Sequence, residues 1–186
     1  MSASPRRGDL VVGPWGARFL GRRLPCAVGR GGIAVKRAEG DGITPAGVWR
    51  LEGGLRRPDR RPAARRGLLL RPIGLRDGWS DDPRDPDYNA RVRLPSAHGA
   101  ERLRRADPLH DLIAVTDFNR APRAPGAGSA IFLHVWRGPR RRTEGCVAFR
   151  ARDLAWILAH WRPGARVVIR AGARMRSVVR AGAEQG

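Results

Sequence analysis

The chain has 186 residues, 41% of them hydrophobic, which is enough to build one domain with a buried core. This apolar content argues against a disordered chain, and no apolar run approaches the ~20 residues that a membrane-spanning helix needs. The net charge of +20 comes almost wholly from arginine, since Lys36 is the only lysine. The use of arginine in place of lysine often reflects the base composition of a genome. The charge alone therefore does not predict a nucleic-acid-binding function.

The N-terminal segment has the polar, basic start of an export signal but lacks its apolar centre. The apolar residues 10–12 are followed at once by Gly13 and Pro14, whereas a signal needs ~7–15 apolar residues in a row. No lipoprotein acceptor sequence precedes Cys26. We therefore expect no signal peptide in this sequence.

Short strands separated by glycine and proline are predicted for the first half of the chain. They fall at residues 10–12, 17–20, 24–28, 33–36, 48–51 and 67–73. Residues 53–66 are rich in Gly, Pro and Arg and predict a solvated loop, and residues 76–90 predict a second polar, proline-rich loop. A short helix is expected at residues 97–105.

The second half of the chain combines strands with one clear helix. Strands are predicted at residues 111–118, 130–136, 146–149 and 165–169. From Ala151 to Trp161, apolar residues recur at helical spacing and give one apolar face. Many short strands with one late helix predict a mainly β fold, closed or sandwiched, with this helix as a cap. No repeat or long linker divides the chain, so we expect one domain over residues 8–170 and a C-terminal tail over residues 171–186.

The residues that carry chemistry lie close together near residue 140. His134 falls in one predicted strand and Cys146 begins the next, so their side chains can approach if these strands are neighbours. A thiol with the ordinary pKa of ~8.5 is mostly protonated at neutral pH, and a histidine within hydrogen-bond reach can take its proton. Gly145 lets the backbone approach a substrate, and the N–H groups of Gly145 and Cys146 can then face a developing oxyanion. A second interpretation stays open, in which His134 is a core histidine and Cys146 a small buried hydrophobe.

Three segments, in the same order along the chain, resemble the catalytic domain of L,D-transpeptidases, the YkuD family. In the segment 129–147, a strand histidine and a loop precede Thr143, a variable residue, Gly and Cys. The segment 36–47 is similar to the family's early stretch with Lys, Gly, Thr-Pro and Gly. Residues 79–89, with Trp-Ser-Asp-Asp-Pro and Tyr-Asn, are similar to one proteobacterial branch. The likeness covers roughly residues 8–170.

The resemblance implies a single β-sandwich or barrel-like domain and a cysteine acyltransferase. Cys146 would be the nucleophile and His134 its base, with the Gly145 backbone in an oxyanion hole and Thr143 beside it. Cys146 would attack the carbonyl that joins the third residue of a peptidoglycan stem to its terminal D-alanine. An amine of a neighbouring stem would resolve the thioester into a 3→3 crosslink. The implied partners are peptidoglycan stem peptides in the cell envelope or periplasm, with no cofactor, and we expect a monomer that binds no nucleic acid.

Further residues are predicted to contact the substrate, and these are Trp79, Asp81, Tyr88, Asn89, Arg142 and Glu144. Aromatic and amide groups suit a polar peptide with charged ends, and an arginine beside the nucleophile suits the stem carboxylates. Trp79 can equally fasten a long loop to the core, and Arg142 can equally lie in a solvated loop. Glu144 stands where the usual family pattern has a histidine, so the residue that takes over that role is left open.

The remaining cysteine and histidines are assigned no chemistry. Cys26 is interpreted as structural, and no metal site is predicted because His98, His110 and His160 lack a chelating spacing. The acceptor stays open between a stem amine, a protein lysine and water, and water would make the chain an L,D-carboxypeptidase with the same cysteine. The alternative outside enzyme chemistry is a basic module that binds wall polymer or nucleic acid.

Overall fold

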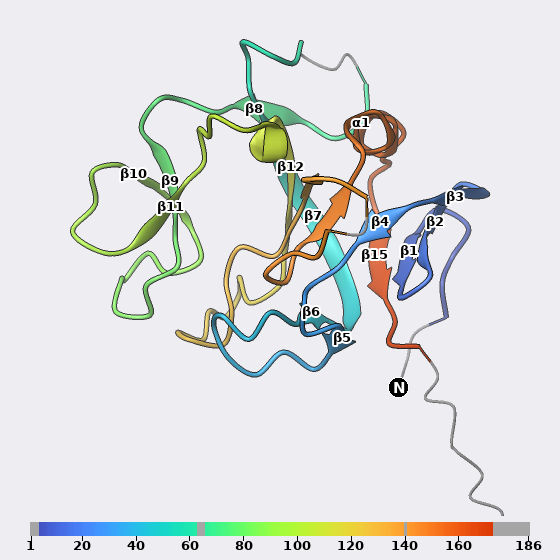
Figure 1. The fold of residues 1–186 in the computed structure, drawn as a ribbon, viewed down its shortest axis with the longest axis horizontal. Helices are drawn as coiled ribbons and strands as arrows, with labels where there is room; N and C mark the ends of the chain where they lie inside the picture. The colour runs from blue at the N-terminus through green and yellow to red at the C-terminus, as the bar shows by residue number, and fades with distance from the viewer. Residues whose placement is uncertain (1–3, 63–65, 140, 173–186) are drawn as a thin grey trace, which may run out of the picture.

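The computed structural model describes residues 4–62, 66–139 and 141–172 and shows a mainly β fold with one α-helix (Figure 1). The fold class is therefore confirmed. The strands are β1 (Leu10–Gly13), β2 (Gly16–Phe19), β3 (Arg22–Leu24), β4 (Cys26–Ala27), β5 (Ile33–Ala34), β6 (Thr44–Pro45), β7 (Gly47–Arg56), β8 (Leu70–Pro72), β9 (Asp77–Ser80), β10 (Arg91–Arg93), β11 (Ala100–Arg102), β12 (Leu112–Thr116), β13 (Phe132–Val135), β14 (Val147–Phe149) and β15 (Arg166–Ile169). The helices are a 3-10 turn (Pro108–His110) and α1 (Ala151–Ala159). The predicted tail at 171–186 lies almost wholly outside the described residues.

One large sheet curves nearly into a barrel. Its strand order is β3-β2-β1-β15-β7-β12-β13-β14-β4, and β8 pairs with β7 beside this path. The two end strands, β3 and β4, follow each other in the chain and are separated only by Pro25. Proline has no N–H to give to a strand pair, so it ends β3 and starts the turn into β4. This single connection joins the two edges of the sheet.

The inner core is enclosed by the large sheet and covered by α1, which lies against β12 and β13. Leu154, Ile157 and Leu158 of α1 are buried there, which confirms the apolar face predicted from their spacing. Each buried side chain of this size contributes ~1.5–3 kcal/mol relative to an exposed one. Core packing therefore fixes α1 and the two strands beneath it.

A second core cluster lies on the other face of the same strands. On β13, Leu133 and Val135 point into the inner core, whereas Phe132 belongs to the second cluster. Trp79 of the small sheet β10-β9-β11 packs edge-on against Phe132, with ring centroids 4.8 Å apart. Because side chains alternate along a strand, His134 shares the face of Phe132. The small sheet therefore covers the face of β13 that carries the histidine.

The helix predicted at residues 97–105 is wrong. Ala100–Arg102 instead forms β11, which pairs antiparallel with β9, and Leu103 is buried in the second core cluster. The backbone groups of this segment find their partners across the sheet, so they do not need those of a helix. The loop predicted at residues 76–90 is wrong in its first part for the same reason, because β9 lies there.

Other strand boundaries also differ from the predictions. β7 continues to Arg56, so the loop predicted at residues 53–66 begins too early. Gly54 allows this continuation, because a Cβ there would lie 2.6 Å from Ile113 O on the neighbouring strand. The strand predicted at 24–28 is divided by Pro25, and that predicted at 67–73 is shortened to β8.

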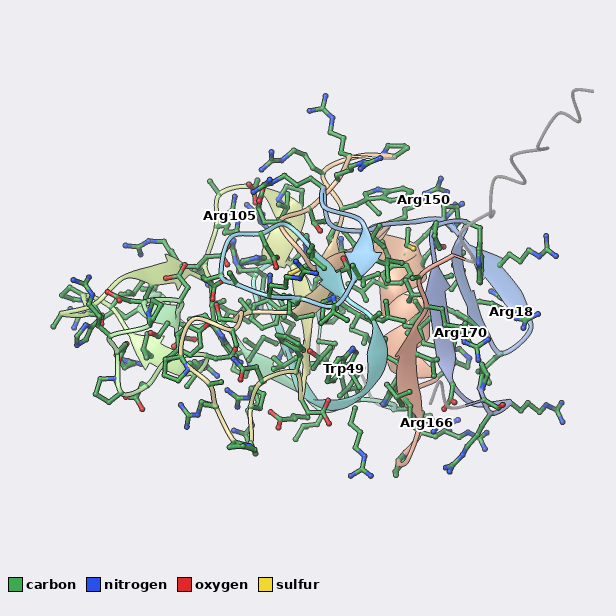
Figure 2. All side chains as sticks on the ribbon, turned by 90° about the horizontal axis from the view of Figure 1, so that it is seen from below. Arg18, Trp49, Arg105, Arg150, Arg166 and Arg170 are labelled. Atoms are coloured by element: carbon green, nitrogen blue, oxygen red, sulfur yellow. The ribbon has the colours of Figure 1, made fainter. Side chains whose placement is uncertain are left out.

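Figure 2 shows arginine side chains, Arg18 among them, projecting from the ribbon on several sides, so the positive charge is not gathered on one face. Within the described residues, no helix is both long enough and apolar enough to span a membrane.

Candidate active site

The structure makes neighbours of the two strands that carry the predicted nucleophile and base. β13 and β14 pair in parallel, with His134 opposite Ala148. Cys146 directly precedes β14 and lies two residues before Ala148, so alternation places it on the same face as His134. Cys146 also packs against the second core cluster. The two side chains thus come from adjacent strands and face the same side of the sheet.

A cleft of about 290 Å³ opens on this side, and both Cys146 and His134 line it. The other residues around it are Glu101, Arg105, Leu109, His110, Phe132, Arg137, Arg141, Arg142, Thr143 and Glu144. A substrate in the cleft can therefore meet a thiol, an imidazole and charged groups of both signs.

The thiol of Cys146 is held by two backbone groups of the segment that leads into β13. Sγ donates a hydrogen bond to Ala130 O at 3.0 Å and accepts one from Phe132 N at 3.3 Å. Burial raises the pKa of Cys146 to about 12, and the Phe132 N–H opposes this shift only in part. Cys146 therefore rests as a neutral thiol with its proton directed at a carbonyl.

The ring of His134 is oriented by the backbone of the next residue. Its Nδ1 lies 2.8 Å from Val135 O. A carbonyl oxygen can only accept, so Nδ1 carries the proton and Nε2 keeps a lone pair. Burial lowers the pKa of His134 to about 4, so the imidazole is neutral near pH 7. His134 is thus present in the form that can take a proton.

The resting pair is neutral rather than a preformed thiolate and imidazolium. Within the described residues, no hydrogen bond joins Cys146 Sγ to the ring of His134. Proton transfer therefore requires the thiol to turn from Ala130 O toward Nε2, and such contacts often tighten only when substrate is bound. This geometry suits general-base activation at the moment of attack.

The turn before Cys146 is fixed by two threonine hydroxyls. Gly145 has a φ of +142°, and a Cβ there would lie 3.0 Å from Ile43 O, so both conformation and space call for glycine. Thr44 Oγ1 donates to Gly145 O at 2.7 Å. Thr143 Oγ1 donates to Cys146 O at 2.6 Å and accepts from Gly145 N at 3.2 Å. The predicted segments 36–47 and 129–147 therefore meet at this turn.

The backbone that holds the thiol depends on the buried side chain of Asn89. Its Oδ1 accepts from Trp79 Nε1 and from Ala130 N, each at 3.0 Å. Its Nδ2 donates to Phe118 O at 3.1 Å and to Asn119 O at 2.7 Å. Ala130 has a φ of +50°, a left-handed conformation that costs ~1–3 kcal/mol in a non-glycine residue. Asn89 thus stabilises the conformation in which the carbonyl of Ala130 faces the nucleophile.

A family model described as the L,D-transpeptidase catalytic domain, YkuD, matches residues 17–169. The chain belongs to this family. The matched range contains β13, β14, α1 and the threonine-fixed turn, and it confirms the resemblance seen in the sequence. Searches of curated proteins and of solved structures find no match.

In the L,D-transpeptidase domain the predicted site residues fall into two groups, those that line the cleft and those that do not. Those that line the cleft are Cys146, His134, Thr143, Arg142 and Glu144, with Gly145 in the adjoining turn. The lining found among the described residues does not include Trp79, Asp81, Tyr88 or Asn89. Trp79, Tyr88 and Asn89 are buried, whereas Asp81 is exposed. In this structure the second group lies behind the cleft or beside it.

Tyr88 fastens the loop before β13 in a similar way. Its hydroxyl donates to Glu39 Oε2 at 2.5 Å and accepts from Gly128 N at 3.0 Å. Burial and the hydrogen bond to Glu39 both raise the pKa of Tyr88. The side chain therefore ties the 36–47 segment to the loop that leads to Ala130.

Arg142 and Glu144 lie at the rim of the cleft and both contact Arg30. Glu144 Oε2 pairs with Arg30 Nε at 2.7 Å, and Arg142 Nη1 donates to Arg30 O at 3.0 Å. The Glu144 side chain is 75% exposed, so this ion pair contributes little to stability. Both side chains remain within reach of a ligand.

Sequence reasoning missed the wall of the cleft formed by Glu101, Arg105 and His110. Glu101 lies on β11 opposite Trp79 of β9. Because a helix was expected over this segment, the alternation of side chains along a strand, which directs Glu101 to the cleft, was not considered. His110 was weighed only as a metal ligand, and among the described residues no group of three or more His, Cys, Asp or Glu is placed to hold a metal ion.

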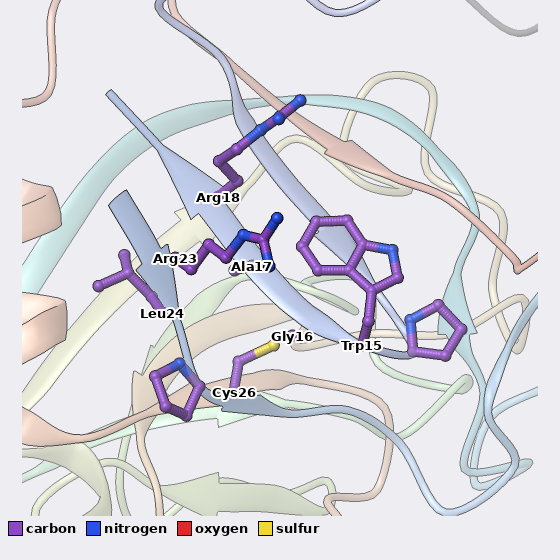
Figure 3. Close-up of a pocket in the computed structure, with 9 residues that line it drawn as sticks. Trp15, Gly16, Ala17, Arg18, Arg23, Leu24 and Cys26 are labelled. Carbon is purple, nitrogen blue, oxygen red and sulfur yellow. The ribbon is translucent and has the colours of Figure 1, made fainter. Parts of the chain in front are cut away.

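The second cysteine lies in a different hollow of the L,D-transpeptidase domain. A groove of about 750 Å³ at the edge of β2 and β3 is lined by Cys26 together with Trp15, Arg18 and Arg23 (Figure 3). Burial raises the pKa of Cys26 to about 12. The described residues that line this groove include no histidine, so a base for this thiol is lacking there.

Proposed function

We propose that this chain is an L,D-transpeptidase that forms a thioester between Cys146 and a peptidoglycan stem peptide and passes the acyl group to an amine. Membership of the family supports a transpeptidase. The observation that carries the proposal is the shared cleft face of β13 and β14, where Cys146 and a neutral histidine with its lone pair on Nε2 line the same cleft. A cysteine and a base that can come within hydrogen-bond reach of each other are what covalent acyl transfer requires.

Acylation begins when His134 Nε2 takes the thiol proton of Cys146. Sγ attacks the carbonyl carbon that joins the third stem residue to D-alanine and forms a C–S bond. The tetrahedral intermediate collapses as the C–N bond breaks, and the leaving amine takes the proton from His134. D-Alanine departs and a thioester remains.

Deacylation reverses these roles with a new nucleophile. An acceptor amine forms a C–N bond with the thioester carbonyl, and the C–S bond breaks with its electron pair returning to Sγ. The proton lost by the amine passes through His134 Nε2 to the sulfur and restores the thiol. The product of a stem amine is a 3→3 crosslink, and the product of water is a tripeptide.

The developing oxyanion needs N–H donors that are fixed before the reaction. The Gly145 N–H already donates to Thr143 Oγ1 at 3.2 Å, so the N–H of Cys146 is the better of the two donors named from the sequence. The threonine contacts to Gly145 O and Cys146 O hold this turn in place. In this proposal Thr143 acts by positioning the backbone of the nucleophile.

The charges around the cleft suit a donor stem that carries carboxylates. Arg105, Arg137, Arg141 and Arg142 all line it. Guanidinium groups bind carboxylates with two parallel hydrogen bonds, which gives orientation as well as affinity. Such a substrate places the proposed reaction in the cell envelope, in the assembly of the wall.

The proposal is tested by following D-alanine release from a disaccharide-tetrapeptide, with dimer and tripeptide products separated by mass spectrometry. Cys146→Ala should lower release by at least on the order of 10³-fold, because the nucleophile is lost. Exposure to a carbapenem should add one acyl adduct to the wild-type chain. Peptide mapping should locate that adduct on Cys146.

Cys26→Ala is the matched control, since it removes the other thiol and leaves the cleft intact. It should retain both D-alanine release and the adduct. Release that persists in Cys146→Ala, or an adduct on Cys26, would rule out the proposed mechanism. Tripeptide without dimer at any acceptor concentration would identify the carboxypeptidase instead.

A further inference from the structure

One wall of the cleft presents two hydrogen-bond acceptors close together. Glu101 Oε1 lies 3.6 Å from His110 Nε2, and both residues line the cleft. His110 Nδ1 lies 3.2 Å from Leu103 O, so Nδ1 carries the proton of this ring. Burial lowers the pKa of His110 to about 3, which keeps the ring neutral with a lone pair on Nε2. A carboxylate oxygen and an imidazole lone pair therefore face each other.

Two acceptors in this arrangement repel unless a donor lies between them. The nearest cation, Arg105, is only partly available, since its Nη1 is 3.5 Å from Glu101 Oε1. Its Nε and Nη2 form short bonds of 2.8 and 2.7 Å with both oxygens of Asp107. Burial raises the pKa of Glu101, which is the mark of a carboxylate whose charge is incompletely compensated. The pair is suited to a ligand with several N–H donors and a positive charge.

The position of the pair relative to the base is also informative. The ring of His110 packs edge-on against that of His134, with centroids 6.0 Å apart. A group held by Glu101 and His110 therefore lies next to the base that serves Cys146. The cleft is also lined by Arg137, Arg141 and Arg142, which repel a cation and attract carboxylates. The cleft thus offers guanidinium groups to carboxylates and, at Glu101, a carboxylate to a cation.

We propose that Glu101, together with His110 Nε2, forms the subsite that binds the ammonium group of the acceptor, which loses one proton to solvent and then attacks the thioester as the neutral amine. This inference rests on the proposed transpeptidase function and deepens it, because it assigns the choice between amine and water to a residue. The arginines recognise the donor, and Glu101, beside the two histidines, recognises the acceptor. Water gains nothing from the charge of Glu101, so the carboxylate favours aminolysis over hydrolysis.

The test uses Glu101→Gln, which keeps the shape of the side chain and removes its charge. Disaccharide-tetrapeptide is the donor, and an isotope-labelled disaccharide-tripeptide is the acceptor, since it has the ammonium group but no D-alanine to lose. Glu101→Gln should raise the half-saturating acceptor concentration about tenfold, the loss expected for a hydrogen bond to a charged group. The product should shift from dimer to tripeptide.

Glu52→Gln is the matched control. Glu52 is 40% exposed and bound to one arginine, Arg120, whereas Glu101 is 37% exposed and contacts Arg105. Glu52 does not line the cleft among the described residues. Its partition between dimer and tripeptide should equal that of wild type.

A neutral nucleophile separates charge recognition from damage to the site. Hydroxylamine is mostly uncharged at neutral pH, so its reaction with the thioester should be equal in wild type and Glu101→Gln. Equal acceptor dependence in Glu101→Gln and Glu52→Gln would overturn the subsite, and so would a parallel loss with both nucleophiles. Failure of wild type to release D-alanine, or release that persists in Cys146→Ala, would instead remove the transpeptidase function and the subsite with it.

Discussion

The two cysteines of this chain lie in hollows that look alike by simple criteria and differ in what surrounds the sulfur. Burial raises the pKa of both Cys146 and Cys26 to about 12, so neither thiol is preactivated. The groove at Cys26 is the larger one, about 750 Å³ against about 290 Å³. The cleft at Cys146 adds His134 and two backbone groups that hold Sγ. Neither the size of a hollow nor the pKa of its thiol distinguishes the proposed nucleophile.

The difference arises from one strand, because both cysteines border β14. Cys26 lies opposite Phe149 on the antiparallel side, and Cys146 precedes β14 on the side of its parallel neighbour β13. Only β13 carries a histidine on the face that the thiol shares. The proposed reactivity of Cys146 therefore depends on strand pairing, and removal of the histidine that β13 supplies should make the Cys146 site resemble the Cys26 site.

The largest effect is expected from His134→Gln. This change leaves Cys146 without a base, which is the situation of Cys26 in its groove. General-base catalysis accounts for about 10²–10⁴-fold in rate, so kcat/KM for D-alanine release should fall by that order. His160→Gln is the control, since Nδ1 of His160 also contacts a backbone carbonyl, Trp156 O at 2.8 Å, but this side chain is exposed at the C-terminal end of α1. A loss of less than about threefold in His134→Gln would show that another group deprotonates the thiol.

The low pKa of His134 also predicts how kcat/KM depends on pH. Burial lowers the pKa of His134 to about 4, so the ring is a neutral base above that pH and a charged, inactive one below it. The kcat/KM of wild type should therefore be level from about pH 5.5 to neutrality and fall tenfold per unit below about pH 4, as measured by D-alanine release. An acid limb near the ordinary histidine value of ~6.5 would contradict the buried, uncharged ring.

An intermediate effect is expected from Asn89→Asp. Asn89 fixes the backbone of Ala130, whose carbonyl accepts a hydrogen bond from the Cys146 thiol. The carboxylate can still accept from Trp79 Nε1 and Ala130 N, but it would face the carbonyls of Phe118 and Asn119 without donors. Loss of buried hydrogen bonds and burial of a charge should lower the free energy of unfolding by about 2–4 kcal/mol. Denaturant unfolding measures this loss, and kcat for D-alanine release should fall with an almost unchanged KM.

The contrary outcome has its own meaning. The sequence places Asn89 among the substrate-binding residues, whereas the structure buries it behind Ala130. Unchanged stability with a raised KM would show that Asn89 contacts the substrate. The variant therefore decides between a residue that binds and one that positions.

The parts of the site that could be predicted from the sequence were those that depend on residues close together in the chain. The Cys–His pair follows from two adjacent strands with alternating side chains, and the glycine at 145 follows from the sharp turn that its φ of +142° now shows. The helix at α1 follows from apolar spacing. In each of these cases the deciding interaction lies within a short stretch or between consecutive strands.

The parts that were not predicted depend on distant pairing. Glu101 reaches the cleft because β11 pairs with β9, and no local signal separates this segment from the helix that was expected. Thr44 supports the nucleophile through a hydrogen bond to Gly145 O, 101 residues away. The role of Asn89 depends on the left-handed conformation of Ala130, and an alanine in the sequence gives no signal for a positive φ. The domain bounds at 8 and 170 remain a prediction.

The smallest effect is expected from Cys26→Ala. Cys26 packs against the inner core as a partly buried side chain, and its loss removes one small apolar group without leaving a polar atom unpaired. The free energy of unfolding should fall by about 1 kcal/mol, a typical value for a point substitution. D-Alanine release should be unchanged, because the groove at Cys26 supplies no base and lies outside the cleft. Loss of release with a fold of wild-type stability would mean that the groove takes part in catalysis, and the comparison between the two thiols would then fail.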